Sequence, residues 1–152
     1  TIKLNELKLI TKNKNITRVI PLPFIGMKKG PVIISPFDKK LKYFFNHLGT
    51  VVEIKNEKLS KGFWATSSFM ASFYNLIFVT SSWLKSKGIK GKEAERYVRE
   101  LFYALSADSL NKKNIPLKKL VKESQTPGGT NASVINELKK NRFYEKQKKR
   151  FK

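Results

Sequence analysis

The chain has 152 residues, of which 32 are Lys or Arg and 11 are Asp or Glu, so its formal net charge is +21. It has no Cys and a single His, which excludes a disulfide framework, a cysteine nucleophile and a metal site built from Cys or several His. With 40% hydrophobic residues it can bury a core, and its length fits one domain, or one domain and part of another. It begins at Thr1 with no signal-peptide pattern, so we expect a cytoplasmic chain whose start has been lost or removed.

The positive charge is spread along the chain. Of the 32 basic residues 27 are Lys and five are Arg, although Arg is the residue suited to bidentate contacts with phosphate and guanine. The densest basic run, residues 139–152, lies at the very end, where a charged tail is usually solvated and mobile. We therefore expect no specific nucleic-acid binding. A basic nucleic-acid-binding protein is kept as an alternative, which predicts steeply salt-dependent binding.

Residues 1–55 alternate between helix and strand. Prolines and glycines bound the short β-rich segments, and Asp38 is placed to cap a helix that Gly49 ends. The expected elements are a helix over 2–10, strands over 16–20, 31–35 and 50–54, and a helix with Leu41, Phe44, Phe45 and Leu48 on one face. Three strands are too few to close a sheet alone, so we expect part of an α/β domain here.

From Asn56 onward every segment is predicted to be helical. The expected helices cover 59–87, 92–105 and 116–123, and a last one carries Val134, Ile135 and Leu138. The predicted fold class is thus α+β, with an α/β part followed by an all-α part that has one long central helix.

The segment Phe63–Leu84 holds 22 residues without a charge, and lysines lie outside both ends. This length and these flanks are typical of a transmembrane helix. However, seven of its residues are Ser or Thr, which favours a helix buried on all sides by other protein. A chain this short can hardly surround a helix about 40 Å long. We therefore predict no membrane span and a homodimer in which a second copy covers the helix.

The sequence Pro127-Gly128-Gly129 interrupts the chain between two predicted helices. Two glycines let a ligand approach the backbone closely, and Thr130 or Asn131 can act as the N-cap of the following helix. The first free N–H groups of that helix, with the positive end of its dipole, would make a small anion site that fits a carboxylate. The same residues are also explained by an ordinary Gly-Gly turn with a Thr or Asn cap, and this second interpretation is kept as an alternative.

No other catalytic or metal-binding constellation is present in the sequence. His47 lies beside the apolar stripe of its predicted helix, and the few carboxylates show no pairing typical of acid–base catalysis. The sequence lacks GxGxxG and GxxxxGK[ST] loops, so it cannot by itself hold a dinucleotide. We assign no catalytic residue and no metal ligand.

Several segments in this order resemble the C-terminal two-thirds of the pyrroline-5-carboxylate reductase family. The most specific is TPGGTN followed by a helix, which is similar to the signature loop of that family, and the next is LGTVVEI leading into the long helix. The matching segments are RVIPLP (18–23), KKGPVIIS (28–35), FFNHLGTVVEI (44–54), GIKGKEAERYVRELF (88–102) and SQTPGGTNASVINEL (124–138).

The resemblance implies an NADPH- or NADH-dependent enzyme that reduces the C=N bond of a cyclic imino acid to give proline. Residues 1–55 would be the end of a Rossmann nucleotide-binding domain. Residues 56–152 would be a helical domain that interlocks with a second copy, a dimer that family members often assemble into larger rings. The substrate would bind at Thr126, Gly128, Gly129, Thr130 and Asn131. The nicotinamide would be bordered by Pro21, Leu22 and Pro23.

Three departures from the family pattern concern the substrate more than the fold. The usual MPNTP is replaced by residues 20–23, so a polar contact next to the nicotinamide is missing. The usual GSGPAY opening of the long helix corresponds to about residues 68–74, without its Gly-Pro feature. The second Thr of the signature loop is Asn131, which offers an amide in place of a hydroxyl. A non-catalytic dimerisation module is therefore a second interpretation.

Overall fold

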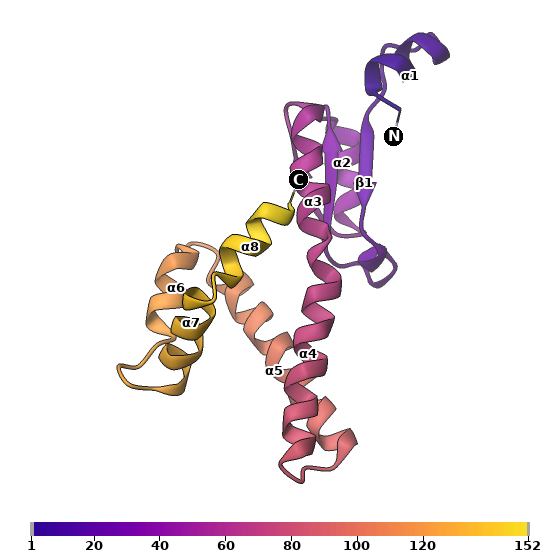
Figure 1. The fold of residues 1–152 in the computed structure, drawn as a ribbon. Helices are drawn as coiled ribbons and strands as arrows, with labels where there is room; N and C mark the ends of the chain where they lie inside the picture. Colours follow the sequence, from indigo (N-terminus) through magenta and orange to yellow (C-terminus); the bar gives the residue numbers. More distant parts are fainter. Residues whose placement is uncertain (1, 152) are drawn as a thin grey trace. The chain divides into compact units, whose positions relative to one another are not determined.

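The computed structural model describes residues 2–151 and divides the chain into two compact units, one up to Trp64 and one from Ala65 onward. The first unit contains a three-stranded sheet and the second is entirely helical, which agrees with the predicted α+β class (Figure 1). The two compact units divide inside helix α3 (Ser60–Ser67), and the domain boundary expected at residue 55 stays a prediction.

The sheet of the first unit has the order β1-β2-β3, with β1 (Arg18–Pro21) antiparallel and β3 (Thr50–Glu53) parallel to the central β2 (Pro31–Ser35). Val19 lies opposite Ile34, and Ile33 lies opposite Val52. Residues 32–35 are all buried, as expected of a central strand with both faces covered.

The first unit also holds α1 (Leu4–Thr11), α2 (Lys39–Asn46) and the short 3₁₀ helices η1 (Pro23–Met27) and η2 (Glu57–Leu59). Helix α2 packs against β3. It begins as predicted, since the carboxylate of Asp38 accepts a hydrogen bond from the N–H of Leu41 at 2.9 Å. Leu4 and Ile54 are further buried apolar residues of the first unit.

The predicted uninterrupted helix over 59–87 is divided at Ser68 into α3 and α4 (Phe69–Ser86). Both the N–H and the hydroxyl of Ser68 donate to the carbonyl of Ala65, at 3.2 and 2.6 Å. The N–H therefore bonds three residues back instead of four, and the hydroxyl shares the same carbonyl, as serine side chains can do inside helices. The expectation of one continuous helix was wrong at this residue, and Gly88, at φ +89°, ends α4 where the sequence indicated.

Helix α4 packs along α5 (Gly91–Asn111), which runs beyond both predicted ends. Ala94 and Val98 are fully buried in this contact, and the rings of Phe73 and Phe102 meet edge to face with centroids 5.6 Å apart. Three further helices follow: α6 (Leu117–Glu123), α7 (Thr130–Lys140) and α8 (Phe143–Arg150).

Helix α8 was not predicted, since its residues were assigned to a solvated basic tail. It packs against α7 and begins after Arg142, whose φ of +53° turns the chain between the two helices. Among residues 2–151, no helix combines the length and the apolar character needed to cross a membrane.

Candidate functional site

The loop between α6 and α7 is built around a tight turn at residues 126–129. The N–H of Gly129 donates to the carbonyl of Thr126 at 2.9 Å, and Gly128 has a φ of +73°. Proline at the second position and glycine with positive φ at the third are the signature of a type II turn. The sequence Thr-Pro-Gly-Gly therefore specifies this turn locally.

The two glycines of the turn meet different constraints. A Cβ on Gly129 would lie 3.1 Å from the carbonyl oxygen of Thr126, which is tighter than most real contacts. A Cβ on Gly128 would meet nothing within 4 Å, but the positive φ strains any other residue there. The turn thus requires one glycine for space and the other for backbone conformation.

Helix α7 starts directly at this turn, with Gly129 as its N-cap. The carbonyl of Gly129 accepts from the N–H of Ser133 at 3.1 Å, and no side chain caps the helix. The prediction that Thr130 or Asn131 is the N-cap was wrong, because closure of the turn already places Gly129 at the first acceptor position. The N–H groups of Thr130, Asn131 and Ala132 precede the first intrahelical donor, so the positive end of the helix lies at the turn.

Asn131 joins the two ends of the loop. Its side-chain amide donates to the carbonyl of Ser124 at 2.9 Å, and Ser124 directly follows α6. The same side chain was predicted to offer its amide to the substrate.

An open groove of about 500 Å³ lies between α6 and α7 and reaches the loop at Thr126 and Pro127. Its other lining residues are Lys118, Val121, Lys122, Gln125, Ala132 and Lys139. Of the five predicted substrate residues only Thr126 lines this groove. Sequence reasoning missed the three lysines, although the spacing of Lys118 and Lys122 on a helix places them on one face.

Pro21, Leu22 and Pro23 lie at the end of β1 and the start of η1, in the first unit. Pro21 pairs with Val32, Leu22 is the N-cap of η1, and Pro23 is its first residue. These side chains have no polar groups, so they could border a flat nicotinamide ring but could not hold the phosphates of a dinucleotide.

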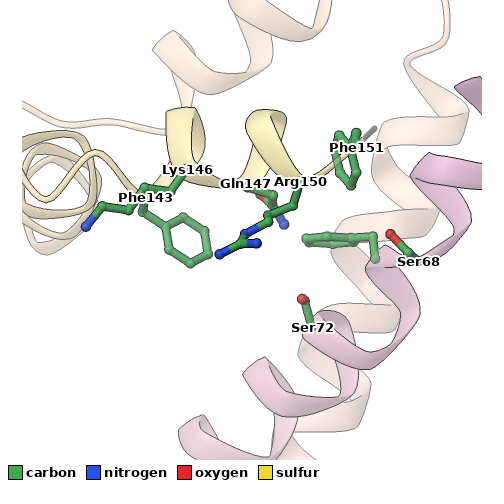
Figure 2. Close-up of a pocket in the computed structure, with 8 residues that line it drawn as sticks. Ser68, Ser72, Phe143, Lys146, Gln147, Arg150 and Phe151 are labelled. Carbon is green, nitrogen blue, oxygen red and sulfur yellow. The ribbon is translucent and has the colours of Figure 1, made fainter.

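A second hollow of the helical unit, about 390 Å³, lies between α4 and α8 and contains none of the predicted site residues (Figure 2). Figure 2 shows the side chain of Arg150 extending toward the ring of Phe143, with the hydroxyls of Ser68 and Ser72 on the facing helix. Within residues 2–151 no group of three or more His, Cys, Asp and Glu could hold a metal ion.

The sequence matches no protein-family model, and no curated protein matches it. Solved structures do match. A pyrroline carboxylate reductase from Plasmodium falciparum, with NADP bound, is 22% identical with a TM-score of 0.76 over 97% of this chain and 62% of that chain. A 1-pyrroline-5-carboxylate reductase from Streptococcus pyogenes is 19% identical with a TM-score of 0.78, covering 99% and 61%. A pyrroline-5-carboxylate reductase from Coxiella burnetii is 17% identical with a TM-score of 0.75, covering 89% and 53%.

The chain has the fold of the C-terminal part of pyrroline-5-carboxylate reductases. The resemblance stated from the sequence is confirmed at the level of the fold. The chain spans 53–62% of the length of these three structures.

Proposed function

We propose that the chain forms the dimerising, substrate-binding part of an NAD(P)H-dependent reductase that acts on a cyclic imino acid such as pyrroline-5-carboxylate. The observation that carries this proposal is the fold shared with three such reductases over 89–99% of the chain. The glycine turn at the start of α7 supports it, because a carboxylate is the group that such a helix end binds well.

In this proposal the substrate carboxylate binds at the turn. The backbone N–H groups of Thr130 and Asn131 donate to it, and the hydroxyls of Thr126 and Thr130 add side-chain donors. The glycines remove side chains that would block the approach, and the helix dipole favours the negative charge. A substrate held by its carboxylate keeps its C=N bond in one orientation. For an enzyme that works mainly by positioning its substrate, this fixed orientation accounts for much of the rate acceleration.

The chemistry needs little acid–base machinery from the chain. A protonated imine is already an electrophile, and its proton can come from water or from a nearby hydroxyl. NADPH or NADH supplies the hydride. Pro21, Leu22 and Pro23 would form an apolar border for the nicotinamide, while the phosphates need a nucleotide-binding loop that the 152-residue sequence lacks. The activity is therefore proposed for these residues joined to a nucleotide-binding domain.

A second copy of the chain is part of the proposal. Helices α4 and α5 leave large apolar side chains more than half exposed, and a monomer rarely exposes so many in one unit. On α4 and α5 they are Tyr74, Phe78, Val79, Trp83, Tyr97, Tyr103, Leu105 and Leu110. A helix with apolar side chains on all its faces needs other protein to cover them, and a second copy of the chain would supply that cover.

The test is the oxidation of NADPH and NADH by the chain joined to a nucleotide-binding domain, with pyrroline-5-carboxylate as substrate. We expect turnover that is lost in Gly129→Val, whose side chain would meet Thr126, and kept in Gly26→Ala, where a Cβ meets nothing within 4 Å. A dimer that binds the nucleotide but turns over neither cofactor would refute this substrate and favour a non-catalytic dimerisation module.

A further inference from the structure

The hydrogen bond from Asn131 to Ser124 is the side-chain link across the loop. Its donor is Nδ2, because a carbonyl oxygen can only accept, so the orientation of the amide is determined by its partner. The bond joins the second residue of α7 to the residue that follows α6, and residues 125–130 lie between them.

Few other bonds hold this segment. Within the loop, Gly129 donates to Thr126. Gln125 donates back into α6 twice, from its N–H to the carbonyl of Lys122 at 3.2 Å and from its side-chain amide to the carbonyl of Val121 at 2.5 Å. Thr126, Pro127 and Gly128 are exposed, so packing contributes little to their order. The Asn131 amide is the bond that joins the start of α7 to the residue that follows α6.

We propose that Asn131 is a positioning residue, which holds the turn at residues 126–129 closed before a carboxylate binds; this proposal rests on the proposed function. An amide bonded to Ser124 does not need to reach the ligand. The carboxylate is then bound by backbone N–H groups and threonine hydroxyls, and a turn that is already closed loses less conformational entropy when the ligand arrives.

The experiment compares three variants of the 152-residue chain. Asn131→Ala removes the bond to Ser124. Asn141→Ala is the matched control, since the amide of Asn141 donates to Glu137 Oε1 at 2.8 Å at the other end of the same helix. Asn131→Asp keeps the shape of the side chain, removes the donor and adds a negative charge that the start of a helix favours.

Two readouts are measured by NMR: the exchange rate of the Gly129 amide with water, and the affinity for L-proline as the carboxylate probe. One hydrogen bond of ordinary strength corresponds to a change of about fivefold. We expect exchange about fivefold faster, and binding of L-proline weaker by a similar factor, in Asn131→Ala, with both unchanged in Asn141→Ala. In Asn131→Asp the exchange of the Gly129 amide should also be faster, while the melting temperature is unchanged or higher. A purely structural role of Asn131 would instead predict faster exchange together with a lower melting temperature.

The outcomes separate the two proposals. Unchanged exchange at Gly129 in both Asn131 variants, or equal acceleration in Asn141→Ala, overturns the positioning role. Faster exchange with unchanged affinity for L-proline also overturns it, because the closed turn would then not serve binding. A wild-type chain that does not bind L-proline contradicts the proposed function instead.

Discussion

The carboxylate of Glu57 lies beside the guanidinium of Arg18, with Oε1 2.8 Å from Nε, and also accepts the N–H of Leu4 at 3.2 Å. The angle at Nε is not that of a hydrogen bond, so the attraction is between the charges. The side chains of Arg18 and Glu57 are 13% and 30% exposed. One carboxylate therefore connects the start of α1, strand β1 and helix η2.

Glu57→Gln should destabilise the first unit. The neutral amide leaves a largely buried guanidinium without its counter-charge, at a cost of about 1–3 kcal/mol. The matched control is Glu53→Gln, because Lys42 and Glu53 form a pair that is 43% and 38% exposed and should contribute less than about 1 kcal/mol. Urea unfolding monitored on the first unit measures the free energy of unfolding of both variants. An equal loss of this free energy in Glu57→Gln and Glu53→Gln would contradict the role of Glu57.

The ion pair between Lys85 and Glu95 predicts a dependence of stability on pH. A hydrogen bond from Lys85, at 2.6 Å, and its positive charge lower the pKa of the Glu95 carboxyl from its ordinary value. A pKa that is lower in the folded state stabilises the fold above the unfolded value of about 4.3, and this contribution is lost as the pH falls through the folded value. The melting-temperature difference between wild type and Glu95→Gln should therefore shrink in acid. A difference that stays constant from neutral pH to pH 3 would contradict it.

Alanine at the two loop glycines should act in different ways. Gly128→Ala places a side chain at φ +73° in open space, so we expect a loss of about 1–2 kcal/mol with the turn kept. Gly129→Ala brings a Cβ to 3.1 Å from the Thr126 carbonyl, so the turn itself must shift. The exchange rate of the residue-129 amide distinguishes the two. Equal rates in both variants would show that the close approach at Gly129 does not matter.

The proposed dimer predicts the effect of a charge on α4. Phe78 is 64% exposed in a single chain and would be covered by the second copy, so Phe78→Asp should weaken association. Ser86→Asp, at the exposed end of α4, introduces the same charge outside the apolar part and should leave the dimer intact. Sedimentation equilibrium measures both. An unchanged association constant in Phe78→Asp would place the interface elsewhere.

Elements with strong local signals could be predicted from the sequence. Asp38 determines the start of α2, and Gly88 with positive φ determines the end of α4. The start of α8 could not be predicted, because it depends on Arg142 adopting a positive φ that no residue type there indicates. The break at Ser68 depends on whether a hydroxyl takes a backbone carbonyl, and serines inside helices often do not disrupt them.

The candidate site was predictable in part. The turn follows from Pro127 and Gly128, whereas the N-cap of α7 depends on closure of that turn through Gly129. The partner of the Asn131 amide could not be predicted, since it depends on how α6 and α7 pack. The roles of all five loop residues in substrate binding stay predictions.

Carboxylate binding at the start of α7 is tested by an NMR titration of the 152-residue chain with L-proline, compared with pyrrolidine, which has the ring but no carboxylate. We expect L-proline to shift the amide signals of Gly129, Thr130 and Asn131, and pyrrolidine to leave them unchanged. If L-proline does not shift these signals, or if pyrrolidine shifts them equally, the turn at the start of α7 does not bind a carboxylate.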